Sequence, residues 1–551
     1  MNKKTTAILI FILIFGSVLR LYQLGQTPIS LFGDELDVAY HSWSLISTGR
    51  DYMGNLLPTY IRSLAEWRAP LLMYFTAPFM ALFGVSPFSV RLPVALLGIF
   101  SLYLVYLVVK KLFQRESVAL LACFILSITP WHLHYSRASF EVVPLLSLTL
   151  LGINSYLNRS LGLSLFWFAL TFFTYSTAYI TTPLILLGLI FIYKLPKEKS
   201  TTNNLFFALS LLLFALVLKN TFWGAASNRF QSLSVLSSFE IEEKVILSRT
   251  EKWVDDNLFE KIFANKYLFS LEKITQNYLS SFSPAFLFST ADPFFRHSSG
   301  RSGLLLTFSF PLFFLGLYWL LTNLHLKESK LLVFLLLVLP LPASLTLDGG
   351  NHATRLFLFV LPLVVISSLS VTLLKKWSNL QKVITLLVAI FIFLSLSTYL
   401  YQYYYHYRFQ SWRYWHFGYD QIFTSLAKIQ GQYSKVYLNN TYQPSLLPFL
   451  VYTKYHPKNF QQNFQTDSPD SYQSEYFNGY KFADKYYFGS TPTLESLSKL
   501  LAEDTVYLVV QGVEVPGDWN WQKEPPEWAR VLDTVYSPLG EPLFYLVTGK
   551  K

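Results

Sequence analysis

Three short groups of charged residues carry side chains that can move a proton or hold an anion. Asp34 and Glu35 form an acidic pair, and a carboxylate placed against a hydroxyl can act as a general base. Arg137, and farther along the chain His352 and Arg355, carry positive groups that stabilise a phosphate or an accumulating negative charge. Such chemistry requires a fold that brings the acids and the cations together.

Each group also has an ordinary structural explanation. Asp34 and Glu35 stand at the start of a predicted helix, where acidic residues cap the first turn. Arg137 and Glu141 are four residues apart, the spacing of a salt bridge on one helical face if the helix continues. Arg355 at a helix end can extend its guanidinium towards water. The positions of these residues in the fold must therefore decide between the readings.

The composition of the 551 residues indicates a membrane protein with many spans. Apolar residues make up 52% and charged residues 14%, against roughly 25% charged in an average soluble protein. So little charge cannot cover a soluble chain of this length, and the apolar content excludes disorder. The net charge of +11 fits cytoplasmic loops rich in Lys and Arg, and no basic patch resembles a nucleic-acid-binding motif. The single cysteine, Cys123, excludes intramolecular disulfides and multi-Cys metal sites.

Eleven apolar segments approach the ~20 residues that a bilayer span requires. They are 5–19, 92–110, 117–135, 140–157, 161–178, 180–195, 204–219, 303–323, 330–347, 355–374 and 382–402. Segment 70–84 is apolar but shorter and contains Pro78, so we predict an interfacial helix there. With this assignment every short Lys-rich cluster lies on the side of the N-terminus. We therefore expect a plasma (inner) membrane protein with a cytoplasmic N-terminus.

This topology divides the chain into a membrane domain, 1–402, and an extracytoplasmic α/β domain, 403–551. The membrane domain has two long outer loops, 25–91 and 220–302. In the outer domain, helical periodicity covers 416–431, 443–455 and 493–503, and strand-like runs cover 435–438, 505–511, 531–536 and 543–548. Segment 457–492, rich in Gln, Tyr, Asp and Ser, is expected to be irregular.

The charged groups then converge on the outer face of the membrane from three separate parts of the chain. The second outer loop adds Asp292, Arg296 and His297 next to a span. Charged residues at the edge of a membrane are costly unless they are paired or functional. Their convergence favours a functional site over separate structural roles.

Several short motifs follow one another in a recognisable order over roughly residues 1–375. They are Arg20-Leu21-Tyr22, Asp34-Glu35, Arg68-Ala69-Pro70-Leu71, Leu82-Phe83-Gly84, Val90-Arg91-Leu92-Pro93, Pro130 through Arg137, and the turn holding His352 and Arg355. Their order resembles that of GT-C glycosyltransferases, specifically the family 39 group that includes protein O-mannosyltransferases and the lipid A aminoarabinose transferase. One departure is Arg68-Ala69-Pro70-Leu71, where many relatives have Lys-Pro-Pro-Leu; the cation is kept.

The resemblance implies a GT-C fold and an enzyme that moves a sugar from a polyprenyl-phosphate carrier to an acceptor outside the cytoplasm, with inversion. Asp34 is then the expected base, while Glu35 orients the loop or contacts the acceptor. Cations in a water-poor site stabilise the leaving lipid phosphate. The expected phosphate ligands are Arg137, His352 and Arg355, with Arg68 and Arg91 behind them. The acceptor is a protein, a glycolipid or a cell-wall polymer, and the sequence does not identify the sugar.

Other readings remain open. A multi-pass transporter or flippase explains the hydrophobicity and the charges equally well, although the long outer loops, the outer domain and the lack of a repeat weigh against it. An oligosaccharyltransferase would carry Trp-Trp-Asp-Tyr-Gly, which is absent from the sequence; a structural membrane protein is a further alternative. A divalent metal is possible, but no metal site or other cofactor is predicted. His132 and His134 would point about 200° apart on a helix, which disfavours joint ligation.

Overall fold

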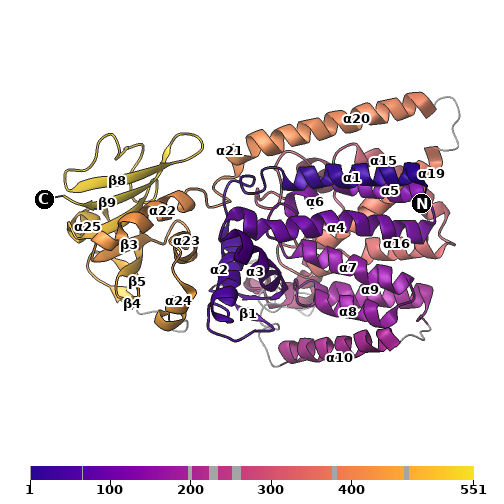
Figure 1. Ribbon diagram of the computed structural model, residues 1–551, viewed down its shortest axis with the longest axis horizontal. Coiled ribbons are helices and arrows are strands. Elements are labelled where there is room, and N and C mark those ends of the chain that lie inside the picture. Colours follow the sequence, from indigo (N-terminus) through magenta and orange to yellow (C-terminus); the bar gives the residue numbers. More distant parts are fainter. Residues whose placement is uncertain are drawn as a thin grey trace.

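The computed structural model describes residues 2–64, 66–196, 201–222, 234–250, 262–374, 381–464 and 471–550. Most helices before residue 402 run along the long axis and form one bundle (Figure 1). They are α1 (Lys3–Leu21), α4 (Pro87–Phe113), α5 (Glu116–Ile128), α6 (Pro130–Tyr135), α7 (Val142–Leu157), α8 (Leu161–Thr171), α9 (Ala178–Tyr193), α10 (Thr201–Phe222), α15 (Ser309–Thr322), α16 (Lys327–Val338), α17 (Leu341–Ser344), α18 (Val360–Leu369), α19 (Val371–Leu374) and α20 (Gln381–Tyr401).

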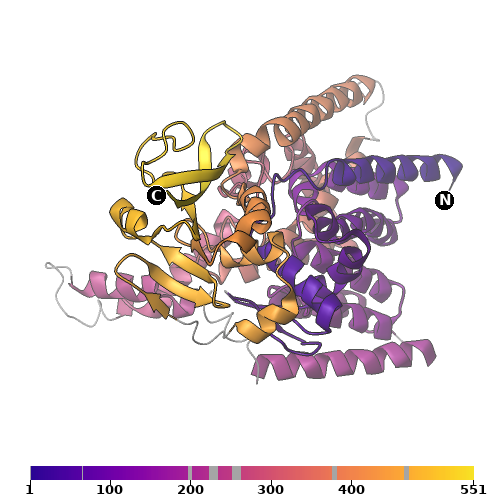
Figure 2. The same ribbon diagram turned by 60° about the vertical axis from the view of Figure 1, so that its left-hand side comes forward.

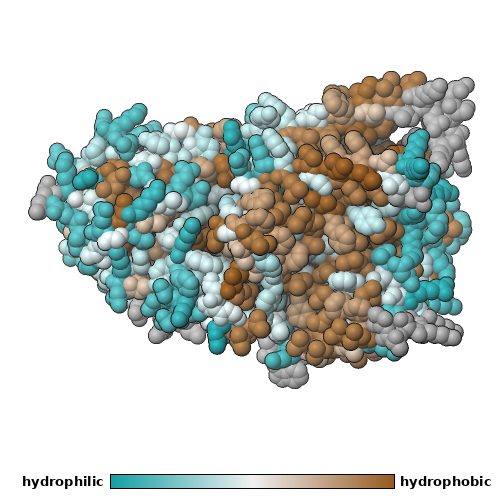
Figure 3. All heavy atoms as spheres, viewed as in Figure 1, coloured by the Kyte–Doolittle hydropathy of each residue, from teal (hydrophilic) through white to brown (hydrophobic). Residues whose placement is uncertain are grey.

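Each predicted span overlaps one of these helices or a pair of them, although α8 ends at Thr171 within 161–178 and α15 begins only at Ser309 within 303–323. Four helical stretches are long and apolar enough to cross a bilayer on their own: Lys3–Leu21, Pro87–Phe113, Asn203–Thr221 and Leu386–Ser411. The space-filling view shows hydrophobic side chains around the bundle and hydrophilic ones at its far end and on the C-terminal domain (Figure 3). This distribution fits a membrane protein, while the number of spans and their orientation stay predictions.

Three predicted spans are not single helices. Span 355–374 is divided into a 3-10 turn at Phe357–Phe359, α18 and α19, and in the other two spans proline is the reason for the break. In 117–135 the chain leaves the helix at Thr129 and starts α6 at Pro130, and in 330–347 helix α16 ends before Pro340 and α17 follows. Proline lacks the N–H that would continue the helical ladder. Likewise, α7 begins only at Val142. Residues 136–141 therefore form a turn, and Arg137 and Glu141 do not share a helical face.

The first outer loop folds into two helices and a short ribbon. Helix α2 (Gly33–Thr48) lies across the end of the bundle, nearly perpendicular to α1 and α4 in Figure 1. Helix α3 (Leu71–Phe83) coincides with the predicted interfacial segment 70–84. Between them, β1 (Ile61–Arg62) and β2 (Trp67–Arg68) pair in antiparallel register. The loop thus presents α2 and the ribbon as the platform for Asp34, Glu35 and Arg68.

The second outer loop, where it is described, is helical. It holds a 3-10 turn at Val235–Ser237, α12 (Phe239–Thr250), α14 (Lys266–Ser280) and a π-helical turn at Phe286–Thr290. A turn at 291–303 leads from this loop towards α15. Residues 223–233 and 251–261 of the loop lie outside the described residues.

The C-terminal domain is built on a mixed sheet of seven described strands in the order β4-β5-β6-β3-β7-β9-β8. Strand β3 is parallel to both β6 and β7, and the other pairs are antiparallel. The strands are β3 (Lys435–Asn439), β4 (Ser471–Gln473), β5 (Asn478–Phe482), β6 (Tyr486–Ser490), β7 (Thr505–Val510), β8 (Ala529–Tyr536) and β9 (Pro542–Gly549). The helices are α22 (Tyr419–Ile429), α23 (Leu446–Tyr452), α24 (Pro457–Asn463) and α25 (Leu494–Leu500).

The predicted helices and strands of this domain are confirmed, but the prediction that 457–492 is irregular is wrong. It contains α24, β4, β5 and β6, with 465–470 outside the described residues. Strands β5 and β6 form a hairpin through Ala483 and Asp484, whose φ angles are +48° and +54°. The loop between the paired residues Phe482 and Tyr486 has three residues, and the two left-handed ones reverse the chain within it. The polar composition of the segment hid this turn because neither residue is glycine.

The C-terminal domain docks on helix α2. The chain enters it through α20, a π-helical turn at Gln402–His406 and α21 (Tyr407–Ser411). Tyr40 on α2 donates its hydroxyl to the Tyr455 carbonyl at 2.9 Å, and the Gln461 side chain donates to Ser44 Oγ at 3.0 Å. The two views agree that the domain lies at the end of the bundle opposite the N-terminus (Figures 1 and 2). This arrangement fits the predicted topology, whose direction across the membrane is not fixed by the fold.

Candidate active site

Arg68 is the centre of the most charged cluster in the described part of the chain. Its buried guanidinium contacts four carboxylates: Asp34 at 2.5 Å, Glu66 at 2.8 Å, Glu141 at 3.0 Å and Asp37 at 3.3 Å. Burial alone would lower the pKa of Arg68, but the surrounding carboxylates raise it well above its usual value. Arg68 is therefore a fixed cation that joins α2, the ribbon and the turn before α7.

Asp34 is the most exposed acid of this cluster, followed by Glu66, whose side chain is 33% exposed. Asp34 is the second residue of α2, in the first helical turn, where the helix dipole stabilises a negative charge. Its side chain is 42% exposed, whereas the side chain of Asp37, one turn later, is 5% exposed. Asp37 also accepts hydrogen bonds from Tyr52 at 2.7 Å and from Ser63. Asp34 can therefore reach a substrate, while Asp37 holds the loop around it.

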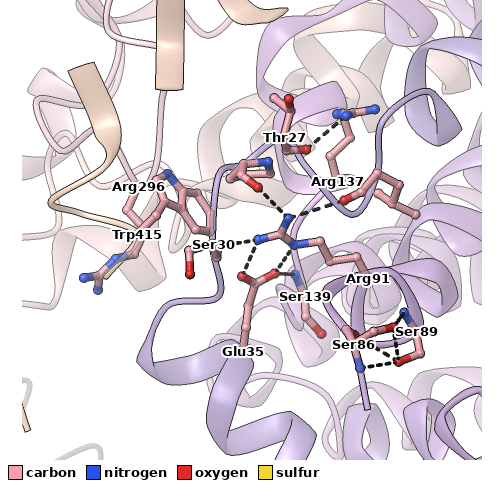
Figure 4. Close-up of polar contacts among 12 residues, drawn as sticks. Thr27, Ser30, Glu35, Ser86, Ser89, Arg91, Arg137, Ser139, Arg296 and Trp415 are labelled. Atoms are coloured by element: carbon pink, nitrogen blue, oxygen red, sulfur yellow. Dashed lines mark hydrogen bonds and ion pairs between the residues drawn. The ribbon is translucent and has the colours of Figure 1, made fainter. Parts of the chain in front are cut away.

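Glu35 and Arg91 form a separate, fully buried ion pair (Figure 4). Arg91 donates to both Glu35 oxygens, at 2.8 and 2.9 Å, and Glu35 also accepts from the Ser139 backbone at 2.9 Å. The remaining Arg91 donors reach carbonyls of the loop before α2, those of Pro28 at 2.8 Å and Ser30 at 2.6 Å among them. This geometry matches the expectation that Glu35 orients the loop. It leaves no Arg91 nitrogen free for a phosphate without rearrangement.

Arg137 is likewise buried and bound to backbone. Its terminal nitrogens donate to the carbonyls of Leu19, Arg20, Gln23 and Thr27 at 2.9–3.3 Å. Its guanidinium also lies 5.0 Å from the centre of the Tyr404 ring. Arg137 does not form the salt bridge with Glu141 that their spacing suggested, and Glu141 instead binds Arg68. Arg137 thus fixes the end of α1 and the loop that follows.

Arg296 and His416 approach Asp34 from two other segments. The Arg296 guanidinium lies 4.7 Å from the centre of the Phe32 ring, and its Nε donates to the Tyr414 carbonyl at 3.3 Å. Burial lowers the pKa of Arg296, and the charge of Asp34 is the largest influence that opposes this shift. A side-chain carbon placed on Gly33 would stand 3.7 Å from His416 Cε1, which puts the imidazole beside the start of α2.

His416 was not a candidate from the sequence. It is 8% exposed, and burial lowers its pKa to about 4, with Arg296 adding to the shift and Asp34 opposing it. Among the described residues, neither of its ring nitrogens has a hydrogen-bond partner. Trp415 before it is fully buried and packs edge-on against Phe32 at 5.1 Å. The motif Trp415-His416 reads as part of an aromatic boundary, so nothing in the sequence distinguishes it.

The remaining candidates gather in a second group around the turn 348–355. Arg355 forms an ion pair with Asp348 and donates to Thr346 Oγ1 at 2.8 Å. His352 lies beside His297, with 4.8 Å between the ring centres. The structure therefore divides the expected phosphate ligands: Arg68 lies with Asp34, Arg91 and Arg137 are bound to backbone, and His352 and Arg355 belong to the second group.

His132 and His134 also have separate partners. His132 Nδ1 lies 2.7 Å from an Arg20 nitrogen, and His134 Nε2 lies 2.8 Å from the Arg296 carbonyl oxygen. The two rings therefore point to different partners, in agreement with their spacing, which disfavours joint ligation of one ion. The His134 contact instead ties the loop carrying Arg296 to helix α6.

Part of the membrane domain is similar in sequence to a known family. Residues 67–223, which include Arg68, Arg91, Arg137 and Glu141, match the family model described as dolichyl-phosphate-mannose-protein mannosyltransferase. No curated protein matches the chain in sequence.

Solved structures give the fold. The Archaeoglobus fulgidus oligosaccharyltransferase tethered with an acceptor peptide has a TM-score of 0.52 at 12% identity, covering 99% of this chain and 74% of that one. Its apo form has a TM-score of 0.44 at 13% identity, covering 86% of this chain and 62% of that one, so the chain spans less than two thirds of that protein. ArnT from Cupriavidus metallidurans bound to undecaprenyl phosphate has a TM-score of 0.45 at 10% identity, covering 98% of this chain and 97% of that one. At a TM-score of 0.52 the oligosaccharyltransferase shows the fold alone, a membrane GT-C fold with a C-terminal sheet domain. The likeness to family 39 glycosyltransferases rests on the family model over residues 67–223.

Proposed function

We propose that this protein transfers a sugar from a polyprenyl-phosphate donor to an acceptor on the extracytoplasmic side of the membrane, with inversion. The observation that carries the proposal is Asp34: an accessible carboxylate at a helix N-terminus, held at 2.5 Å by a buried arginine that three further acids fix in place. The family match supports it, since the matched residues include Arg68 and the model is named for a lipid-phosphate-linked sugar.

In this proposal Asp34 takes the proton of the acceptor hydroxyl as the oxygen attacks the anomeric carbon. Arg68 keeps Asp34 ionised and oriented, because a cation beside a carboxylate favours its charged form. One carboxylate suffices, since the leaving group is a phosphate and needs no proton from an acid. A single displacement opposite the leaving group inverts the anomeric centre.

The lipid phosphate requires a cation across the anomeric carbon from Asp34, and Arg296 is our first choice. Its guanidinium is half-buried and packs on Phe32, two residues before Asp34. Arg91 and Arg137, which the sequence favours for this role, are assigned to holding the loop before α2. Arg91 binds Glu35 and backbone carbonyls, and the terminal nitrogens of Arg137 bind backbone carbonyls. His416 lies beside Gly33 at the start of α2 and is proposed to contact the acceptor or the sugar.

The class of reaction is tested with purified protein in nanodiscs and a panel of lipid donors. The panel contains polyprenyl monophosphates carrying hexoses or pentoses, and a polyprenyl pyrophosphate carrying an oligosaccharide. We expect release of free polyprenyl monophosphate from at least one monophosphate donor when an envelope extract supplies acceptors. Release only from the pyrophosphate donor would favour an oligosaccharyltransferase. Movement of intact donor across proteoliposome membranes without cleavage would favour the transporter or flippase alternative.

A further inference from the structure

Outside the Arg68 cluster, three metal-binding side chains meet at the end of the second outer loop. They are Asp292 and His297, from the turn that leads towards α15, and His352, from the turn after α17. Each offers one ligand atom, and these atoms lie within 4.8 Å of one another. The two segments are 55 residues apart in the sequence from His297 to His352, so the convergence arises from the fold.

Asp292 is held in a defined orientation. It is 2% exposed, and its Oδ1 accepts from the Phe294 backbone at 2.9 Å. Its Oδ2 accepts from the Ala353 backbone at 2.9 Å and lies 3.2 Å from His297 Nδ1. The Asp292 carboxylate therefore already bridges the two segments, and hydrogen bonds from two backbone N–H groups fix its position.

The two imidazoles complete the donor set. Their ring centres are 4.8 Å apart with planes inclined by 31°, and the side chains are 16% and 18% exposed, so solvent reaches both. Among the residues that the structure describes, the buried His352 Nδ1 has no hydrogen-bond partner. A buried imidazole nitrogen without a hydrogen-bond partner is an unsatisfied donor or acceptor, and an ion bound between the two imidazoles and the carboxylate could satisfy it.

We propose that Asp292, His297 and His352 bind a divalent transition metal, with Zn²⁺ as the reference ion. Two imidazole nitrogens and one carboxylate oxygen are a common ligand set for Zn²⁺ with a water in the fourth position. Ligand distances of ~2.0–2.2 Å place tetrahedral ligand atoms about 3.3 Å apart, so the side chains close by about 1–1.5 Å around the ion. Rotation of the two rings supplies this movement, while the backbone N–H groups keep Asp292 in place.

The ion would act on the position of Arg296. Arg296 precedes His297 directly, and its carbonyl is already bound by His134 on α6. A metal that joins His297 to His352 would tie this loop to the turn before α18 and so fix the guanidinium beside Asp34. The proposed role of the ion is to hold this loop in place, and the site stands whether or not the proposed sugar transfer is correct.

The test measures metal content and not activity. The full chain is stripped with a chelator, equilibrated with Zn²⁺, desalted and assayed by elemental mass spectrometry; Co²⁺ serves as a spectroscopic probe of tetrahedral coordination. We expect about one Zn²⁺ per chain and visible Co²⁺ bands in the wild type. His352→Ala and His297→Gln should weaken Zn²⁺ binding at least about tenfold, while His325→Ala, which removes an exposed histidine in the loop after α15, should leave it unchanged.

Wild-type protein that retains no Zn²⁺ above the level of His352→Ala overturns the proposal, and so does equal loss of metal in the His325→Ala control. A second readout separates misfolding from loss of ligands. Zn²⁺ should raise the melting temperature of the wild type and of the control, and should leave that of a folded His352→Ala variant unchanged. Equal shifts in all three proteins would also contradict the site.

Discussion

Removal of the Glu35 carboxylate should destabilise the protein strongly, because it leaves a buried cation unpaired. Glu35 and Arg91 are both 0% exposed, and Arg91 directs its remaining donors to carbonyls of the loop before α2. Breaking a buried ion pair by removing one partner costs about 3–5 kcal/mol. Glu35→Ala should fall in this range. Glu35→Gln, which keeps an acceptor for the Ser139 backbone but loses the charge, should cost about half as much.

The assay is thermal unfolding of the detergent-solubilised protein, combined with limited proteolysis of residues 24–32. The matched control is Glu272→Gln, which breaks an ion pair between Glu272 and Lys244 of similar length, 2.8 Å, whose side chains are about half exposed. Exposed pairs contribute about 0–1 kcal/mol, so this variant should melt like the wild type. If Glu35→Gln also melts like the wild type but abolishes transfer, Glu35 is a catalytic group and our reading of the ion pair is wrong.

Two further predictions concern stability. Burial lowers the pKa of His41 and of His416 from 6.5 to about 4. Below pH 6.5 the unfolded chain binds a proton at each histidine that the folded protein does not bind. The stability that each residue contributes above pH 6.5 is therefore lost as the pH falls towards 4. This difference in pKa between the folded and unfolded states corresponds to about 3 kcal/mol of stability per residue. Between pH 7 and 4.5 the melting temperature of His416→Gln should fall less steeply than that of the wild type. Identical slopes would exclude a contribution from His416. Gly316→Ala on α15 should cost about 1–3 kcal/mol, because an added side-chain carbon would overlap the Ile366 carbonyl oxygen on α18, whereas Gly431→Ala meets no atom within 4 Å and should melt within about 1 °C of the wild type.

The sequence predicts the helical layout well because the bilayer imposes it. Apolar segments of the right length become bundle helices, and the shorter segment 70–84 becomes the separate helix α3. The breaks at Pro130 and Pro340 follow from the missing N–H of proline and could have been drawn from the sequence. The hairpin at Ala483 and Asp484 could not, since its left-handed residues carry no glycine signal.

The site was harder to predict than the fold. The charge of Arg91 and Arg137 suggested phosphate ligands, yet their donors are bound to carbonyls of a loop whose path no periodicity reveals. His416 lies in an aromatic segment that resembles a membrane boundary, and its place beside α2 depends on how the C-terminal domain docks. Asp34, in contrast, stands at the predicted start of a helix, and the structure leaves its carboxylate accessible.

The most direct test of the central claim is donor turnover by the wild type beside Asp34→Asn, with release of polyprenyl phosphate as the readout. Arg68 keeps three carboxylates in Asp34→Asn, so this variant should fold and melt close to the wild type. Asp518→Asn, an exposed acid in the C-terminal domain, is the control. We predict that Asp34→Asn lowers turnover by a factor of about 10²–10⁴, the usual contribution of a general base, and that the control retains full activity. Full turnover by a folded Asp34→Asn variant would contradict the account.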